Sequence, residues 1–340
     1  MGLGPAPSPS NAPPAQASDL RIQLDLLLTE HVMILAKESA AALNSSSEFR
    51  AYATLLTTNE SALTEVVRRA VGNTTADAFA VHWRTLNADL VDYAIQVATH
   101  DGEKADADTS RLTDSTMPDL ADQLADITLG QAQPLLAAVT NEVTAIRDTI
   151  DGAANHQYAA MYTNLVTAVS AATTLGDAIA AGVVRRFADR FPGEQAADDV
   201  ARRVHLNVLL QERAYLETMA TDAQFDSRPD ERTHALHALA SNLDFLATEL
   251  HDPGLRQLWA DQMTSIQRYA TSGDVASKQA LSGTFVNRLV TMTKVSTSVA
   301  SNQVDATIRV IDDQRAKDNG DVANDDRAAA TAMQPIADSL

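Results

Sequence analysis

Long apolar stripes at helical spacing, separated by glycine, constrain the fold of this 340-residue chain more than any other feature of its sequence. Leucines recur three and four residues apart, as in the segments 20–35 and 236–250. This period is that of one face of an α-helix, and no stretch alternates with the period of two that is typical of a strand. Glycines such as Gly72, Gly130 and Gly273 fall between these segments, where helices commonly end. The pattern predicts an all-α protein.

Capping signals refine the expected helix boundaries. The serine run before Glu48 is typical of a capping box, and Asp252 places a cap residue before a proline in the first turn. The most polar internal segment, 101–115, is expected to be a loop. The expected helices are 19–43, 47–71, 75–101, 116–129, 131–151, 155–190, 196–223, 229–250, 253–272, 275–316 and 321–340.

Landmarks of the first half of the chain recur in the second half in the same order. Trp83 and Tyr93 match Trp259 and Tyr269 with the same spacing, and these are the only two tryptophans. Such large aromatic side chains are expected to anchor the core of a helical bundle. Further matched pairs are Asn59 with Asn242, Asp151 with Asp312, and Asp177 with Asp338.

The repeat and the short connections predict two tandem up-down helical bundles that arose by internal duplication. A Pro/Ser/Ala-rich leader, 1–18, precedes them and is expected to be disordered. The first bundle unit is expected to span 19–193 and the second 194–340, with shorter connections in the second unit.

Composition excludes several classes of function. The chain has no cysteine, so thiol catalysis, disulfide scaffolds, cysteine zinc sites and iron–sulfur clusters are excluded. The formal net charge of −19 argues against nucleic acid as a partner, because sequence-independent binding to nucleic acid needs a basic surface. No run of 18 apolar residues occurs, so no transmembrane segment is expected.

The leader bears on localisation. Five of the 11 prolines lie in its first 14 residues, and it contains no apolar core of a signal peptide. It is similar to the linker that follows a removed signal peptide or a lipid-anchored cysteine in bacterial surface proteins. We expect an extracytoplasmic or cell-surface protein whose signal or anchor is not in this chain; the alternative is a cytoplasmic protein with an extended start.

His31 is the best single candidate for a metal ligand. Its helical position falls in the stripe of buried leucines, with Glu30 beside it. One imidazole cannot hold a metal alone, so carboxylates of other helices, Glu60 or Glu142, would have to converge on it. We therefore weigh a copper, iron or zinc site at His31, Glu30 and Glu60 against a hydrogen-bonded core histidine.

Two further patterns concern chemistry at the surface and catalysis. Asp230, His234 and His237 are spaced so that they share one helix face, which would make either a weak surface site for zinc or copper or a solvated face. No serine stands in a nucleophile-elbow or Ser-x-x-Lys context, and no glycine-rich phosphate loop follows a strand. No catalytic or cofactor-binding residue is nominated, and an enzyme is not expected.

The segment Leu27–Val32, the Trp83…Tyr93 pair and the segment Thr174–Ile179 resemble a family of secreted, mostly Gram-positive bacterial tandem helical-bundle proteins, sometimes labelled copper amine oxidase-like. The resemblance implies histidines on several bundle helices, suggestive of a metal or haem pocket. Only His31 is retained here. The other slots hold Leu86, Glu142, Ala171, Arg213, Gln262, Gln303 and Ala332.

This departure favours a non-enzymatic protein with a structural, self-assembly or partner-binding role. The alternative is a metal- or haem-binding bundle of ferritin-like character that uses His31 and nearby carboxylates. The expected partner is another protein or a second copy of the chain. High acidity favours solubility and repulsion of anionic surfaces.

Overall fold

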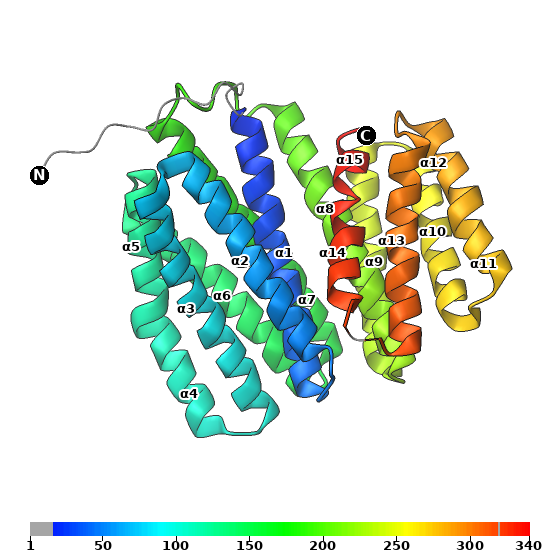
Figure 1. Cartoon of the computed structure of the whole chain (residues 1–340), viewed down its shortest axis with the longest axis horizontal. Helices are drawn as coiled ribbons and strands as arrows, with labels where there is room; N and C mark the ends of the chain where they lie inside the picture. The colour runs from blue at the N-terminus through cyan, green and yellow to red at the C-terminus, as the bar shows by residue number, and fades with distance from the viewer. Residues whose placement is uncertain (1–15, 319) are drawn as a thin grey trace, which may run out of the picture.

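The computed structural model describes residues 16–318 and 320–340, and the expected leader, 1–18, lies almost wholly outside them. The described part is helical throughout and contains no strand, which confirms the all-α class. Two groups of helices stand side by side (Figure 1). The first group comprises α1 (Ala17–Leu43), α2 (Phe49–Val71), α3 (Asn73–Ala98), α4 (Gly102–Arg111), η1 (Leu112–Thr116), α5 (Met117–Thr128), α6 (Ala132–Ala154) and α7 (Tyr158–Arg186).

The second group follows after the connection 187–197 and repeats the order of long helices and one short π-helical turn. It comprises α8 (Asp198–Phe225), α9 (Pro229–Leu250), α10 (Pro253–Ser272), α11 (Val275–Gln279), η2 (Ala280–Phe285), α12 (Val286–Met292), α13 (Thr297–Ala316), α14 (Val322–Thr331) and α15 (Gln334–Ala337).

The predicted loop 101–115 is wrong, because this segment is α4 followed by η1. Asp101 caps α4 by accepting a hydrogen bond from the Lys104 backbone N–H, and Leu112 is fully buried. The polar residues of this segment therefore form the outer face of a helix. Polarity alone does not separate such a face from a loop.

Two long predicted helices are each divided. The predicted helix 275–316 contains η2 and then breaks at 293–296, where Thr293 is extended and Ser296 caps α13 by accepting from the Val299 backbone N–H. The predicted helix 321–340 is split after Thr331, and Pro335 lies in the first turn of α15, where its missing N–H costs nothing.

The four aromatic landmarks lie inside the two helix groups. Trp83 and Trp259 have no exposed surface, and Tyr93 and Tyr269 are only 5% and 3% exposed. Each tyrosine donates a 2.7 Å hydrogen bond to an aspartate on a later helix, Tyr93 to Asp151 and Tyr269 to Asp312. Burial and this acceptor raise the pKa of Tyr93 to about 12.

Other buried contacts also recur between the two groups. Asn59 of α2 donates to the Leu27 carbonyl and to Glu30 on α1. In the second group Asn242 of α9 donates in the same way to Leu209 and Glu212 on α8. Arginines near the starts of α1 and α8 pair with aspartates near the chain end of each group, Arg21 with Asp177 and Arg203 with Asp338.

Three helix pairs make most of the contact between the two groups. α1 packs on α8 at the centre, α2 on α14 at one side and α7 on α9 at the other. α1 and α8 are buried on nearly all sides, which explains why both carry buried charged residues as well as leucines. The connection 187–197 is tied to the first group: Arg190 donates to the Ala70 carbonyl, and the Pro192 carbonyl accepts from the Ala17 N–H.

Candidate functional site

Each helix group encloses a buried polar centre beside its tryptophan. In the first group His31 of α1 lies against Trp83 of α3, with ring centroids 4.9 Å apart. The His31 Nε2 is 2.8 Å from the Asn87 Oδ1, and its Nδ1 is 3.4 Å from Glu142 Oε1 of α6. None of these side chains is more than 5% exposed. Three helices thus bring an imidazole, an amide and a carboxylate together in a dry interior.

Several polar atoms of this centre have no hydrogen-bond partner. They are the His31 Nδ1, the Trp83 Nε1, the Asn87 Nδ2 and both carboxylate oxygens of Glu142. Unpaired buried polar atoms are costly, so such a centre favours a bound water, an ion or a proton shared between imidazole and carboxylate. The His31 ring lies 3.4 Å from Glu142 Oε1 and forms an ion pair with it when the ring is protonated.

The second group fills the corresponding place with arginine. The Arg213 guanidinium stacks over Trp259 at 5.3 Å, donates 3.0 Å to the Trp259 carbonyl and lies 3.0 Å from the Glu217 carboxylate. Burial raises the pKa of Glu217 and lowers that of Arg213. Gln262 and Gln303 hydrogen-bond to each other nearby. An arginine side chain therefore stands where the first group has an imidazole.

The three predicted metal ligands, His31, Glu30 and Glu60, do not converge on one point. Both carboxylates are already paired with arginine side chains. Glu30 is occupied by Asn59 and by a bidentate contact from Arg327, at 2.9 and 3.2 Å. Glu60 accepts two hydrogen bonds from Arg84, at 3.0 and 2.7 Å. Among the described residues, no three His, Cys, Asp or Glu side chains form a group that could hold a metal ion. Glu142 is the carboxylate that does face His31.

The surface pattern Asp230, His234 and His237 lies on α9. Asp230 and His237 are exposed and His234 is half-buried. The two imidazole rings meet edge to face, with centroids 5.8 Å apart.

A second polar cluster lies between the helix groups and was not predicted. Lys37 of α1 donates to the Tyr52 hydroxyl at 3.1 Å, to the Thr218 hydroxyl at 2.9 Å and to Asp326 of α14. Lys37 and Asp326 are 6% and 1% exposed. A lysine directly after the apolar run 32–36 is the only hint in the sequence, and nothing in the sequence names a partner 289 residues away.

One helix bears on membrane association. α7 is long and apolar enough to cross a membrane by length and composition, although no run of 18 wholly apolar residues exists. Half of the residues in its most apolar 18-residue stretch are buried, and the helix packs on α1, α6 and α9. Its place in the core explains its composition.

Comparison of the chain with protein-family models, with curated proteins and with solved structures gives no match. Functional arguments therefore rest on the residues themselves.

Proposed function

We propose that the chain is a non-enzymatic, extracytoplasmic protein with a structural and partner-binding role, built from two fused copies of one helical bundle. The observation that carries the proposal is the contact between the helix groups. If α1 corresponds to α8, α2 to α9 and α7 to α14, then the α2–α14 contact is the counterpart of the α9–α7 contact. The same two kinds of helix therefore meet twice, with the groups that supply them exchanged. This is the pattern of a two-fold, self-complementary dimer interface.

The recurring contacts support the duplication. The pairs made by Asn59 and Asn242 are the same, and so are those made by Tyr93 and Tyr269. The expected unit boundary near 193 falls within the connection 187–197. The proposed role follows from an all-helical body with a formal net charge of −19, which suits a spacer or an assembly subunit better than a reaction chamber.

Self-association is the proposed mode of assembly, and light scattering after size exclusion tests it. Copies with a charge of −19 repel one another at low salt, and salt shortens the range of that repulsion. We expect a monomer in 10 mM salt and a mass that rises with protein concentration in 0.5 M salt. Monomers at every concentration and salt level would contradict an assembly role.

The alternative, a metal- or haem-binding bundle, is favoured by one observation, the unpaired oxygens of Glu142 facing His31. Metal analysis and an absorption spectrum of protein purified without an affinity tag decide between the two. Stoichiometric copper, iron or zinc that is lost in His31→Ala and kept in the exposed control His205→Ala would overturn the structural role. We expect no stoichiometric metal in any of the three proteins.

A further inference from the structure

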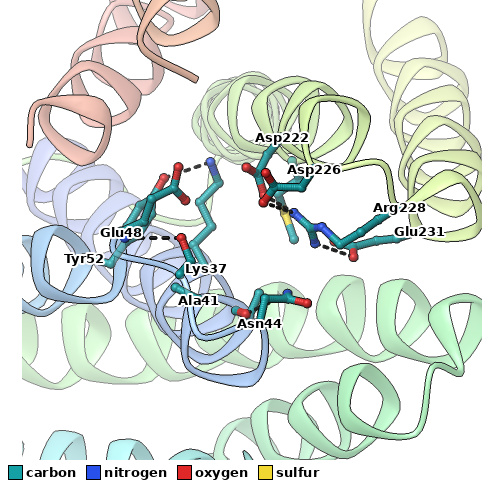
Figure 2. A pocket seen from close by; sticks show the side chains of 12 residues that line it. Lys37, Ala41, Asn44, Glu48, Tyr52, Asp222, Asp226, Arg228 and Glu231 are labelled. Carbon is teal, nitrogen blue, oxygen red and sulfur yellow. Dashed lines mark hydrogen bonds and ion pairs between the residues drawn. The ribbon is translucent and has the colours of Figure 1, made fainter. Parts of the chain in front are cut away.

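One end of the contact between the helix groups holds an unbalanced cluster of charges around a small cavity. Figure 2 shows the α1–α2 turn facing the α8–α9 turn across this space. The cavity, about 20 Å³, has room for about one water molecule. The first group contributes Lys37, Glu48 and Tyr52, and the second contributes Asp222, Asp226, Arg228 and Glu231.

The two cations of this cluster already have carboxylate partners. Arg228 binds Asp222 and Glu231 and lies 3.7 Å from Asp226. Lys37 binds Asp326, which reaches the cluster from α14. Glu48 is the remaining carboxylate, and no salt bridge among the described residues includes it.

Ionised Glu48 faces like charges from the opposite helix group. Asp222 of α8 and Asp226, which directly follows α8, are the carboxylates across the cavity. Burial, and then the charge of Asp222, raise the pKa of Glu48 to about 7. Burial also raises the pKa of Asp222. The phenol of Tyr52 stays neutral, since burial raises its pKa well above the usual value.

We propose that this end of the interface is a proton-controlled contact, in which a proton on the Glu48 carboxyl holds the α1–α2 turn against the α8–α9 turn and its loss loosens them. The folded protein keeps a proton that an unfolded glutamate releases above its ordinary pKa of 4.5. The contribution of this contact is therefore full at low pH and is lost as the pH rises through about 7. Physiological pH lies in the responsive range.

Hydrogen exchange measured by mass spectrometry at pH 6 and pH 8 tests the proposal on the full chain, with labelling times scaled to the intrinsic exchange rates. In the wild type we expect peptides over 44–52 and 222–231 to exchange several-fold faster at pH 8. In Glu48→Gln, which keeps the neutral form, exchange of these peptides should be the same at both pH values. Glu65→Gln, an exposed change on α2, should behave like the wild type.

A second variant tests the same contact in case Glu48→Gln fails to fold. Asp222→Asn removes a like charge that raises the pKa of Glu48, so the loosening should become weaker and should move to lower pH. Equal protection of the wild type at pH 6 and pH 8 would overturn the proposal. So would a pH response that persists in Glu48→Gln, or a response in Asp222→Asn with an unchanged midpoint.

Discussion

Single residues that differ between the two helix groups show how each group handles buried charge. Asp25 follows Arg21 by four residues, and Asn207 follows Arg203 by four. Asn207 donates its amide to Asp338 at 3.1 Å. Asp25 has no exposed surface and no hydrogen-bond partner for either oxygen, and the Arg21 Nε approaches its Oδ2 only to 3.9 Å. The approach of Gly176 leaves no space around it. Only a protonated Asp25 could donate as Asn207 does.

Asp25→Asn should remove a loss of stability that develops as the pH rises from about 4 to about 9. Burial, followed by the charge of Asp177, raises the pKa of Asp25 from 3.8 to about 9. Between these values the folded chain holds a proton that the unfolded chain has released, so stability falls as the pH rises, by at most about 1.4 kcal/mol per pH unit. Urea unfolding at pH 5, 7 and 9 should show the variant gaining over the wild type as the pH rises. The exposed change Asp148→Asn should show no such trend.

At the scale of helices, several C-terminal ends have a side chain at a position where glycine is common. Several helices end on a residue other than glycine in the left-handed conformation, among them Leu129 after α5 and Lys317 after α13. A side chain in this conformation costs free energy that glycine does not. These residues therefore lower the stability of the folded chain, and replacing them with glycine should raise it.

Leu129→Gly should stabilise the protein by about 1 kcal/mol. Leu129 has φ 51° and is 70% exposed, so little packing is lost with its side chain. Leu129→Ala keeps a Cβ and should give no gain from the backbone. Urea unfolding of both variants separates the two effects; an equal change in both would mean that backbone strain is not the cause.

Most of the long helices could be predicted from the sequence, for a physical reason. Helical periodicity is written locally, so the stripe of Leu239, Leu243 and Leu246 identified α9 and the helical class. The segment 101–115 was predicted wrongly because a short helix with one buried edge has little apolar content. The break before α13 depends on one serine cap, a weaker signal than the helically spaced valines and leucine around it.

At the scale of the whole molecule, the contact between the helix groups combines apolar packing with buried ion pairs. Its pairs, Lys37 with Asp326 and Glu30 with Arg327, join the first helix to α14. Such pairs could not be predicted, since they depend on how finished bundles meet. Pairs between helices of one group are equally hidden in the sequence, which directed attention to Glu60 as a metal ligand, whereas the structure places it against Arg84 of α3.

Lys37→Met should destabilise the protein by about 3–5 kcal/mol, because it leaves Asp326 buried without a cation. The double variant Lys37→Met, Asp326→Leu should recover much of that loss, since no charge is then left alone. Arg256→Met, which breaks an exposed pair with Asp244, should change stability little. Urea unfolding measures all three, and a double variant no better than the single one would contradict the buried-pair argument.

The join between the first helix and α14 sets an order of events during synthesis. Lys37 leaves the ribosome 289 residues ahead of Asp326. At about 5–20 residues per second, its ammonium group waits roughly 15–60 s for its counter-ion. The buried ion pairs of α1 with α14 therefore form only when translation is nearly finished, and a nascent chain that stalls before α14 leaves Lys37 without its buried counter-ion.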